Sequence, residues 1–287
     1  MSMEREDLPT TTYTPDSAIA SPRRLLRDML RDLRASRELA WRLAVRDISA
    51  QYRQTLLGCF WLLAIPLIHS IIWIFLGLSG TLAVGTTSIP YPAYVLAGTL
   101  LWTIFTDAVQ APLQGVMESK EVLARINFPR EAIILSGVYQ VAFNACIKFA
   151  LLAALLPLLG VPPAWSQALA PLGIMTILLA GLVLGLLLTP VGLLYTDIAK
   201  GLPLLLQFLM FLTPVIYPLP ANGPARTLLL LNPLTPLIEV TRQWLTGQQA
   251  NMIAYLFLMV LVALAAMLVL WVVYRLAMPI VIERMGS

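Results

Sequence analysis

Long runs of apolar residues, separated by short polar segments, dominate the chain from about residue 56 onward. Six runs approach the roughly 20 residues that a helix needs to cross a bilayer. They predict spans at about 56–79, 91–114, 132–159, 168–194, 202–219 and 252–276. Each must be helical or enclosed by protein, because lipid offers no hydrogen-bond partner to a free backbone group. The fifth run is the weakest, since Pro214 and Pro218 interrupt it.

The first 55 residues follow a different pattern and divide in two. Residues 1–20 are rich in Thr, Pro, Ser and acidic groups and predict a mobile tail. Ser21 and Pro22 are then suited to the N-cap and first turn of a helix. Leu and Met repeat at helical spacing among Arg residues, so 21–55 predicts a basic amphipathic helix in the cytoplasmic membrane interface. Such a helix either only anchors the topology or also meets an anionic lipid head or a partner subunit.

The connection 217–251 is too short and too interrupted to cross the bilayer twice, yet too apolar for a free loop. Asn232 and Pro233 break it between two apolar stretches. It predicts short external re-entrant helices, whose ends must be buried in protein. Glu239 and Arg242 lie three residues apart and can pair on one helical face; the alternative is that both are solvated.

Composition and charge place the chain among membrane proteins. It is 59% hydrophobic and 12% charged, whereas soluble domains carry about 25% charged residues. Residues 1–55 carry ten of the 19 Lys and Arg residues, and the loops 80–90 and 160–167 carry none. The six apolar runs therefore predict an all-α integral membrane protein with six spans, and the positive-inside rule places both termini in the cytoplasm.

The sequence offers little for catalysis. The single histidine, His69, makes a His-based zinc site improbable, and no paired carboxylates indicate a transferase or hydrolase. The segment 80–87 has the glycine spacing of a phosphate loop, but Thr86 occupies its Lys position. We therefore expect no catalytic residue, no metal, no nucleic-acid partner and no cofactor bound by this chain, and no ATP hydrolysis by it alone.

Some polar and aromatic residues lie inside the predicted spans. Asp107 and Lys148 lie about 10 and 24 Å from the cytoplasmic ends of their spans, so a direct pair is not expected. Lys148 either faces a cavity or snorkels to the outer surface.

Gly181 and Gly185 form a GxxxG pattern that permits close helix packing. Deep aromatic residues are candidates for lining a pathway through the bundle, with core packing as the alternative: Trp102, Phe105, Tyr139 and Phe143.

Four motifs stand in order between about residues 46 and 244. They are Arg46-Asp47-Ile48 with 52–58, Trp61 and Pro66; 124–131; 203–207 with 211–218; and 231–234 with Ile238, Glu239 and Arg242. Together they resemble the permeases of ABC-2 type polysaccharide exporters, which export O-antigen and wall teichoic acid. The Phe-Pro-Arg-Glu junction at 128–131 favours the O-antigen branch.

The resemblance implies a transport subunit in the bacterial inner membrane. Two copies would work with two separate ATP-binding subunits, which would hold ATP and Mg, and would export a polymer on polyprenyl diphosphate, head first. The 117–125 segment would couple to the ATPase through Glu118, Lys120, Glu121 and Arg125; its alternative is a solvated loop. Asn232, Glu239 and Arg242 would belong to an external gate.

Arg42, Arg46 and Arg53 are separated by four and seven residues, so they share one helical face. Because a guanidinium presents a planar fork of donors to phosphate oxygens, they are candidates for holding the lipid diphosphate. The alternative is that they bind ordinary anionic lipid and set the topology.

Two other functions stay open at this stage. One is an ABC-2 exporter of teichoic acid, lipid or drug. The other is a membrane enzyme or flippase that acts on lipid-linked sugars without ATP. The docking-type loop and the absence of clustered carboxylates favour the polysaccharide exporter over the second.

Overall fold

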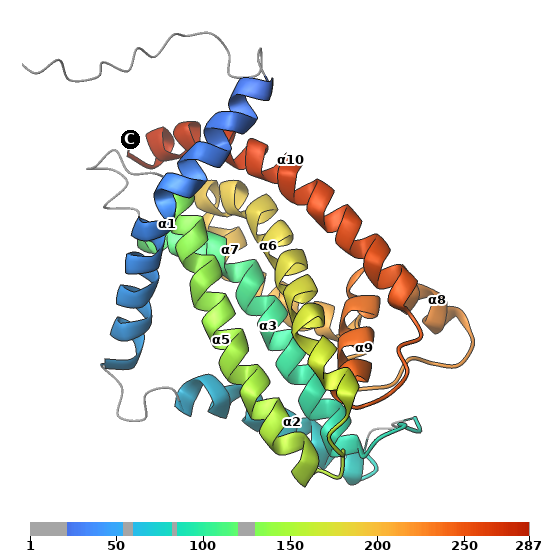
Figure 1. Cartoon of the computed structure of the whole chain (residues 1–287). Coiled ribbons are helices and arrows are strands. Elements are labelled where there is room, and N and C mark those ends of the chain that lie inside the picture. Colours follow the sequence, from blue (N-terminus) through green and yellow to red (C-terminus); the bar gives the residue numbers. More distant parts are fainter. Residues whose placement is uncertain (1–21, 54–59, 82–84, 120–129, 287) are drawn as a thin grey trace, which may run out of the picture.

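The computed structural model describes residues 22–53, 60–81, 85–119 and 130–286. Within these ranges the chain is helical and has no strand (Figure 1). The elements are α1 (Pro22–Arg53), α2 (Phe60–Leu78), α3 (Tyr91–Glu118), α5 (Arg130–Leu158), the short 3-10 helix η2 (Trp165–Leu169), α6 (Ala170–Leu194), α7 (Thr196–Phe211), α8 (Pro224–Leu231), α9 (Leu234–Leu245) and α10 (Ile253–Gly286). The predicted mobile tail, 1–20, lies outside the described residues.

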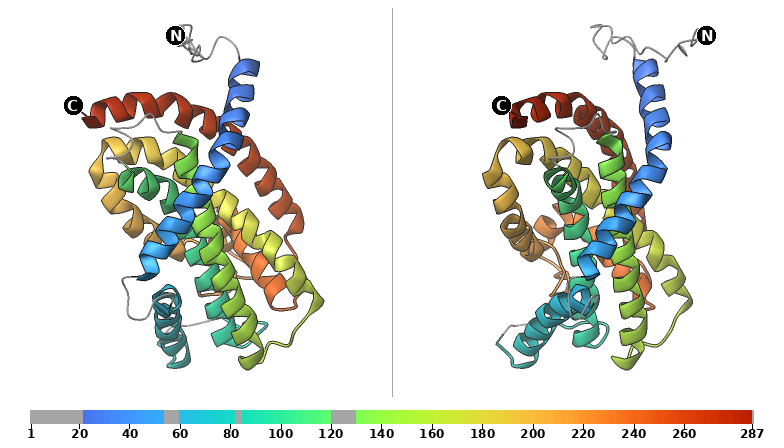
Figure 2. Two further views of the ribbon diagram at one scale, coloured as in Figure 1. Left: turned by 60° about the vertical axis from the view of Figure 1, so that its left-hand side comes forward. Right: turned by 90° about the vertical axis from the view of Figure 1, so that its left-hand side faces the viewer.

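Five helical segments are long and apolar enough to cross a membrane. They correspond to five of the six predicted runs and comprise α2, α3, α5, η2 with α6, and α10. The helix α10 is 34 residues long, or about 51 Å at 1.5 Å per residue. This exceeds the roughly 30 Å hydrocarbon core, and the C-terminal part of α10 turns across one end of the bundle (Figure 2).

The predicted fifth span, 202–219, is not formed as one helix, so the count of six is not confirmed. The helix α7 starts earlier, at Thr196, and ends at Phe211 after 16 residues. Its last turn tightens, with Leu212 N–H donating to Leu209 O and Thr213 N–H to Met210 O. Pro214 and Pro218 lack the N–H that would continue the helix, and a turn follows instead.

The helix α3 is the centre of the bundle. It packs against α2, α5, α6, α7 and α9, and 78% of its most apolar stretch is buried, against 6% for α10. Gly181 and Gly185 of α6 lie directly against α3. A methyl group at Gly181 would lie 2.6 Å from Ala108 Cβ, and one at Gly185 would collide with the Val109 carbonyl. The GxxxG pattern therefore serves the packing of α6 on α3.

The bundle has two distinct ends. The Glu118 end is where α3 finishes, α5 starts and the last turns of α10 lie, and the Tyr91 end is where α2 finishes and α3 starts (Figure 1). Ser166 donates to Trp244 O over 3.0 Å, and Gln248 donates to Ser88 Oγ over 2.7 Å. Three segments predicted on the external side thus meet at the Tyr91 end.

The helix α1 lies along α5 (Figure 2). Its buried face consists mainly of small residues at helical spacing, Ser36, Ala40 and Ala44. Trp41 meets Tyr139 of α5 edge-on, with ring centroids 5.7 Å apart. Small side chains let the two helix backbones approach closely, while the large apolar residues Leu30, Trp41 and Val45 stay exposed.

Candidate functional site

A polar cavity of about 540 Å³ lies between α1, the start of α2, α3 and α5, in the half of the bundle toward the Glu118 end. Nearly half of its described lining residues carry amides or charged groups: Arg46, Asp47, Gln51, Asp107, Gln110, Gln114, Glu118, Gln140 and Asn144. Such a cavity has the size of a typical small-molecule site, about 300–1,000 Å³. It is the first candidate site.

Asp47 fixes α1 against α5 beside this cavity. Its carboxylate accepts a hydrogen bond from Arg46 Nε over 2.7 Å and one from Gln140 Nε2 over 3.1 Å. Arg46 is therefore already paired, and it lies both on the exposed surface of α1 and on the cavity wall. Its position joins the cavity to the surface of the helix.

The other two arginines of the predicted stripe lie on the same helix. Arg42 pairs with Glu38 over 2.5 Å, and both side chains are about three-quarters exposed. A pair this exposed contributes about 0–1 kcal/mol, so Arg42 remains free to exchange partners. Arg53 ends α1, and its side chain lies outside the described residues.

The predicted coupling residues fall largely on undescribed chain. Glu118 is exposed at the end of α3 and lines the mouth of the cavity. Lys120, Glu121 and Arg125 lie in 120–129, outside the described residues. The coupling role of the 117–125 segment therefore stays a prediction.

Asp107 and Lys148 form a direct ion pair, so the expectation that they stay apart was wrong. Lys148 Nζ lies 2.7 Å from Asp107 Oδ2. The Lys148 side chain is 3% exposed, whereas that of Asp107 is 32% exposed and lines the cavity. Lys148 thus lies in the bundle interior behind Asp107 rather than on the described cavity wall, and the alternative that it snorkels to the surface is wrong.

Side-chain direction explains the error. Residue counting gave the two backbones a separation of about 14 Å along the membrane normal. The helices α3 and α5 run antiparallel, and helical side chains tilt toward the N-terminus of their own helix. Asp107 and Lys148 therefore lean toward each other, and the four-carbon stem of Lys bridges the remaining gap. The helix α3 also continues beyond the predicted end at 114, to Glu118.

The predicted channel aromatics separate into two groups. Trp102 and Phe105 are buried in the core, with ring centroids 5.2 Å apart. They lie on α3, which neighbouring helices surround, so they adopt the core-packing alternative. Tyr139 is half-buried beneath Trp41, and Phe143 is 40% exposed on α5. Only these last two lie near a surface of this chain.

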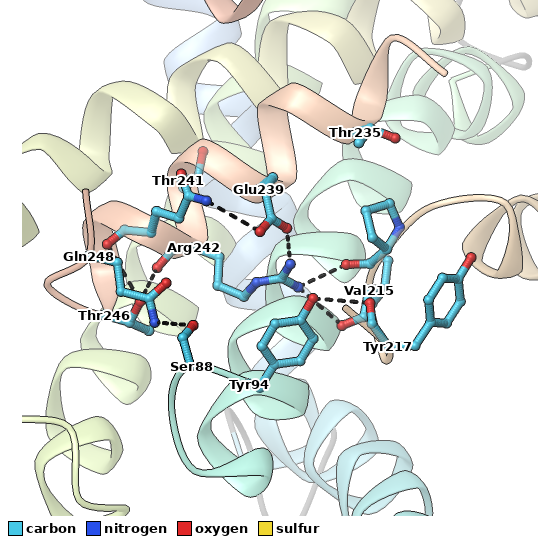
Figure 3. A network of polar contacts seen from close by, with 12 residues as sticks. Ser88, Tyr94, Val215, Tyr217, Thr235, Glu239, Thr241, Arg242, Thr246 and Gln248 are labelled. Atoms are coloured by element: carbon cyan, nitrogen blue, oxygen red, sulfur yellow. Dashed lines mark hydrogen bonds and ion pairs between the residues drawn. The ribbon is translucent and has the colours of Figure 1, made fainter. Parts of the chain in front are cut away.

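Arg242 is the centre of a second polar site, toward the Tyr91 end (Figure 3). It is 2% exposed, pairs with Glu239 as the spacing predicts, and lies 3.7 Å above the Tyr94 ring. Its Nη1 donates to Pro214 O over 2.8 Å and to Val215 O over 3.3 Å. The alternative that Glu239 and Arg242 are simply solvated is therefore wrong.

Asn232 also bonds to the turn after α7, which contains Pro214 and Val215. Its amide nitrogen donates to Leu212 O over 2.8 Å and to Thr213 Oγ1 over 2.9 Å, and its oxygen accepts from Leu234 N–H over 2.9 Å. Asn232 and Arg242 together tie the turn after α7 to the start and the last turn of α9. The three predicted gate residues thus form one connected structure.

Two features of these sites were missed in the sequence. Tyr94 and Gly98 of α3 receive the turn after α7: Tyr94 donates to Tyr217 O over 3.0 Å, and a side chain at Gly98 would collide with Val215 O. Backbone acceptors leave no sequence signal, so this contact was not readable. The second feature is a row of polar side chains on α5. The sequence could have revealed it, because the row recurs every four residues: Ser136, Gln140, Asn144 and Lys148.

Comparisons with known proteins agree on one family. A family model described as "ABC-2 type transporter" matches residues 38–246. The O-antigen export system permease protein RfbA of Myxococcus xanthus is 28% identical over 214 residues, which cover 73% of this chain and 81% of that protein. A Klebsiella pneumoniae protein of the same name is 22% identical over 177 residues, which cover 60% of this chain and 66% of that protein.

Proposed function

Because the chain belongs to the ABC-2 type transporter family, we propose that it is the membrane subunit of an ATP-driven exporter of O-antigen-like polysaccharide. The proposed substrate is a glycan linked to polyprenyl diphosphate, which crosses the bacterial inner membrane from the cytoplasm. The observation that carries the proposal is the family match over 38–246, together with the similarity to O-antigen export permeases. The five apolar helices agree with a multi-pass membrane protein.

ATP hydrolysis is assigned to a separate subunit, which binds ATP and Mg. The proposed contact is the Glu118 end, through Glu118, Lys120, Glu121 and Arg125. In this proposal both termini and that end face the cytoplasm. The helix α1 supports this orientation, since residues 22–55 carry nine Arg against four acids.

The lipid head is proposed to bind on the surface of α1. Arg42 and Arg46 are exposed there, and Arg53 follows on the same helical face. Guanidinium groups suit a diphosphate because they form paired, charge-assisted hydrogen bonds. Arg46, on the wall of the cavity, connects this surface to the interior.

The outer exit is assigned to the structure around Arg242. Glu239, Asn232 and Arg242 tie the turn after α7 to α9. A gate built this way moves as a unit, because separating α9 from the turn strands a buried guanidinium. Opening then requires displacement of the whole assembly relative to α3.

A second copy of the chain is proposed to complete the channel. Large apolar side chains stay exposed on α2 and α7, including Phe75, Phe208 and Phe211. In a membrane, such faces meet either lipid or another copy. Aromatic faces suit a glycan channel, because they stack on sugar rings without demanding a fixed register.

Deletion of the gene in its bacterial host tests the proposal. Loss of the surface polysaccharide, with the polyprenyl-linked glycan accumulating in the cytoplasmic leaflet, is the expected result. The control is the same strain with the gene restored on a plasmid. Unchanged surface polysaccharide in the deletion strain would contradict the proposal. So would a deletion strain that keeps its surface polysaccharide but no longer exports a drug or a simple lipid.

A further inference from the structure

Two rows of polar side chains face each other across the cavity between α1, α3 and α5. On α5 they are Ser136, Gln140 and Asn144; on α3 they are Asp107, Gln110, Gln114 and Glu118. These helices are apolar enough to cross a membrane. Polar groups at such positions are costly unless they pair or face a hydrated or ligand-filled space. Their convergence on one cavity therefore calls for an occupant.

Ser136 shows that the wall has unused hydrogen-bonding capacity. It is 4% exposed and lines the cavity. Its hydroxyl has no hydrogen-bond partner within the described part of the chain. A buried hydroxyl of this kind usually meets a ligand or an ordered water. Among the neighbouring amides, Gln110 Nε2 donates to Thr106 O over 3.2 Å, and Gln114 Nε2 reaches Gln110 Oε1 only over 3.4 Å.

The charges on the wall disfavour an anion. Arg46 is the cation on the wall and is bound to Asp47. Lys148 is buried behind Asp107 and neutralises it. Glu118 adds a further negative charge at the mouth. A diphosphate placed inside would meet three carboxylates and no uncommitted cation among the described residues that line the cavity.

The wall also contains no aromatic side chain among its described lining residues. Binding in the cavity must therefore rely on directional hydrogen bonds rather than on stacking. Directional hydrogen bonds hold a ligand in one register, which suits recognition and would impede the sliding of a polymer.

We propose that this cavity binds an uncharged, hydroxyl-rich group, namely the sugar unit adjacent to the lipid diphosphate. The diphosphate stays outside, on the arginine surface of α1, while the first sugar enters and bonds to Ser136 and the amides. The inference rests on the proposed function and deepens it by placing substrate recognition in this cavity. The cavity of about 540 Å³ accommodates a mono- or disaccharide unit.

The test compares two probes on the full chain in nanodiscs. One is octyl diphosphate carrying a single hexose or N-acetylhexosamine, and the other is octyl diphosphate alone. Affinity is measured for the wild type and for the double variant Ser136→Ala, Gln114→Leu. Loss of two hydrogen bonds should weaken binding of the matching sugar-bearing probe by roughly tenfold or more and leave the sugarless probe unchanged.

Stability separates a binding role from a structural one. Ser136→Ala removes a buried hydroxyl that has no hydrogen-bond partner among the described residues, so the unfolding temperature should stay unchanged or rise. The matched control is Ser70→Ala, which removes a buried serine hydroxyl bonded to Pro66 O and Thr99 Oγ1 outside the cavity. It should leave sugar affinity intact.

Several results would overturn the site. One is an equal loss of affinity for both probes in the double variant. Another is an unchanged affinity of the double variant for the sugar-bearing probe. The third is a wild-type chain that binds no tested sugar-bearing probe more tightly than octyl diphosphate alone. Failure of the proposed function is distinguishable. In that case the wild-type chain, together with its ATPase, would not export a glycan at all. If only this site is wrong, the double variant would still export at the wild-type rate.

Discussion

Lys148 Nζ lies 2.7 Å from Asp107 Oδ2, joining two helices across 41 residues of sequence. In this ion pair the Lys148 side chain is buried, and the Asp107 side chain faces the polar cavity. The pair therefore forms the inner end of that cavity. It also supplies the charge balance that lets a lysine lie deep inside an apolar bundle.

Lys148→Met should destabilise the chain because it leaves the Asp107 carboxylate without its partner. Breaking a buried pair costs about 3–5 kcal/mol, and we expect about 2–3 kcal/mol because Asp107 is partly exposed. The double variant Asp107→Asn, Lys148→Met should recover most of that loss. Unfolding in detergent measures both. Equal stability of the single and double variants would show that the pair is not coupled.

The sequence predicts the spans well and the contacts between them poorly. Apolar runs such as 252–276 predict helices because lipid leaves the backbone no alternative. The Arg242–Glu239 pair was predictable because helical spacing alone brings the two residues together. The hydrogen bonds from Arg242 to the carbonyl groups of Pro214 and Val215 were not predictable, because every residue carries a backbone carbonyl group. The end of α7 depended on how far Pro214 interrupts a helix, which the hydrophobic pattern does not show.

Gly185→Leu should disrupt the contact between α6 and α3. The first side-chain atom alone would collide with Val109 O and touch Pro112. Gly201→Ala is the matched control, since a methyl group there meets nothing within 4 Å. We expect a loss of several degrees in the unfolding temperature for Gly185→Leu and no loss for Gly201→Ala. Equal unfolding temperatures would refute the close packing.

Arg242→Gln should free the turn after α7. The variant removes donors to Pro214 O and Val215 O and takes from Glu239 its cationic partner, leaving it the hydrogen bond from Gln243 Nε2 among the contacts described. Hydrogen bonds to charged groups contribute about 1.5–3 kcal/mol each, so amide exchange in 212–217 should accelerate at least tenfold. Arg226→Gln is the control, because Arg226 bonds only to Pro220 O and Ala221 O in its own loop among the contacts described. Similar exchange in both variants would show that Arg242 is not the anchor.

Arg275→Gln should loosen α1 from the bundle. Arg275 pairs with Asp32 of α1 over 2.5 Å and with Glu131 of α5 over 3.2 Å. Loss of this double contact should increase protease cleavage within 22–40 in the membrane-inserted protein. Asp197→Asn is the control, as Asp197 is an exposed acid at the start of α7. If α1 remains as resistant as in the wild type, its docking depends on the α1–α5 contacts alone.

Reconstituted transport tests the central claim most directly. The chain and its ATP-binding subunit are placed in proteoliposomes that contain a fluorescent polyprenyl-diphosphate glycan on the ATPase side. The measurement is the amount of glycan that becomes accessible to a glycosidase on the opposite side. The account predicts accessibility that requires both subunits and hydrolysable ATP. The account would be contradicted if the isolated chain, without ATP, moved as much glycan across the membrane as the complete complex with ATP. It would also be contradicted if the complex transported another molecule with ATP while the glycan stayed on the ATPase side.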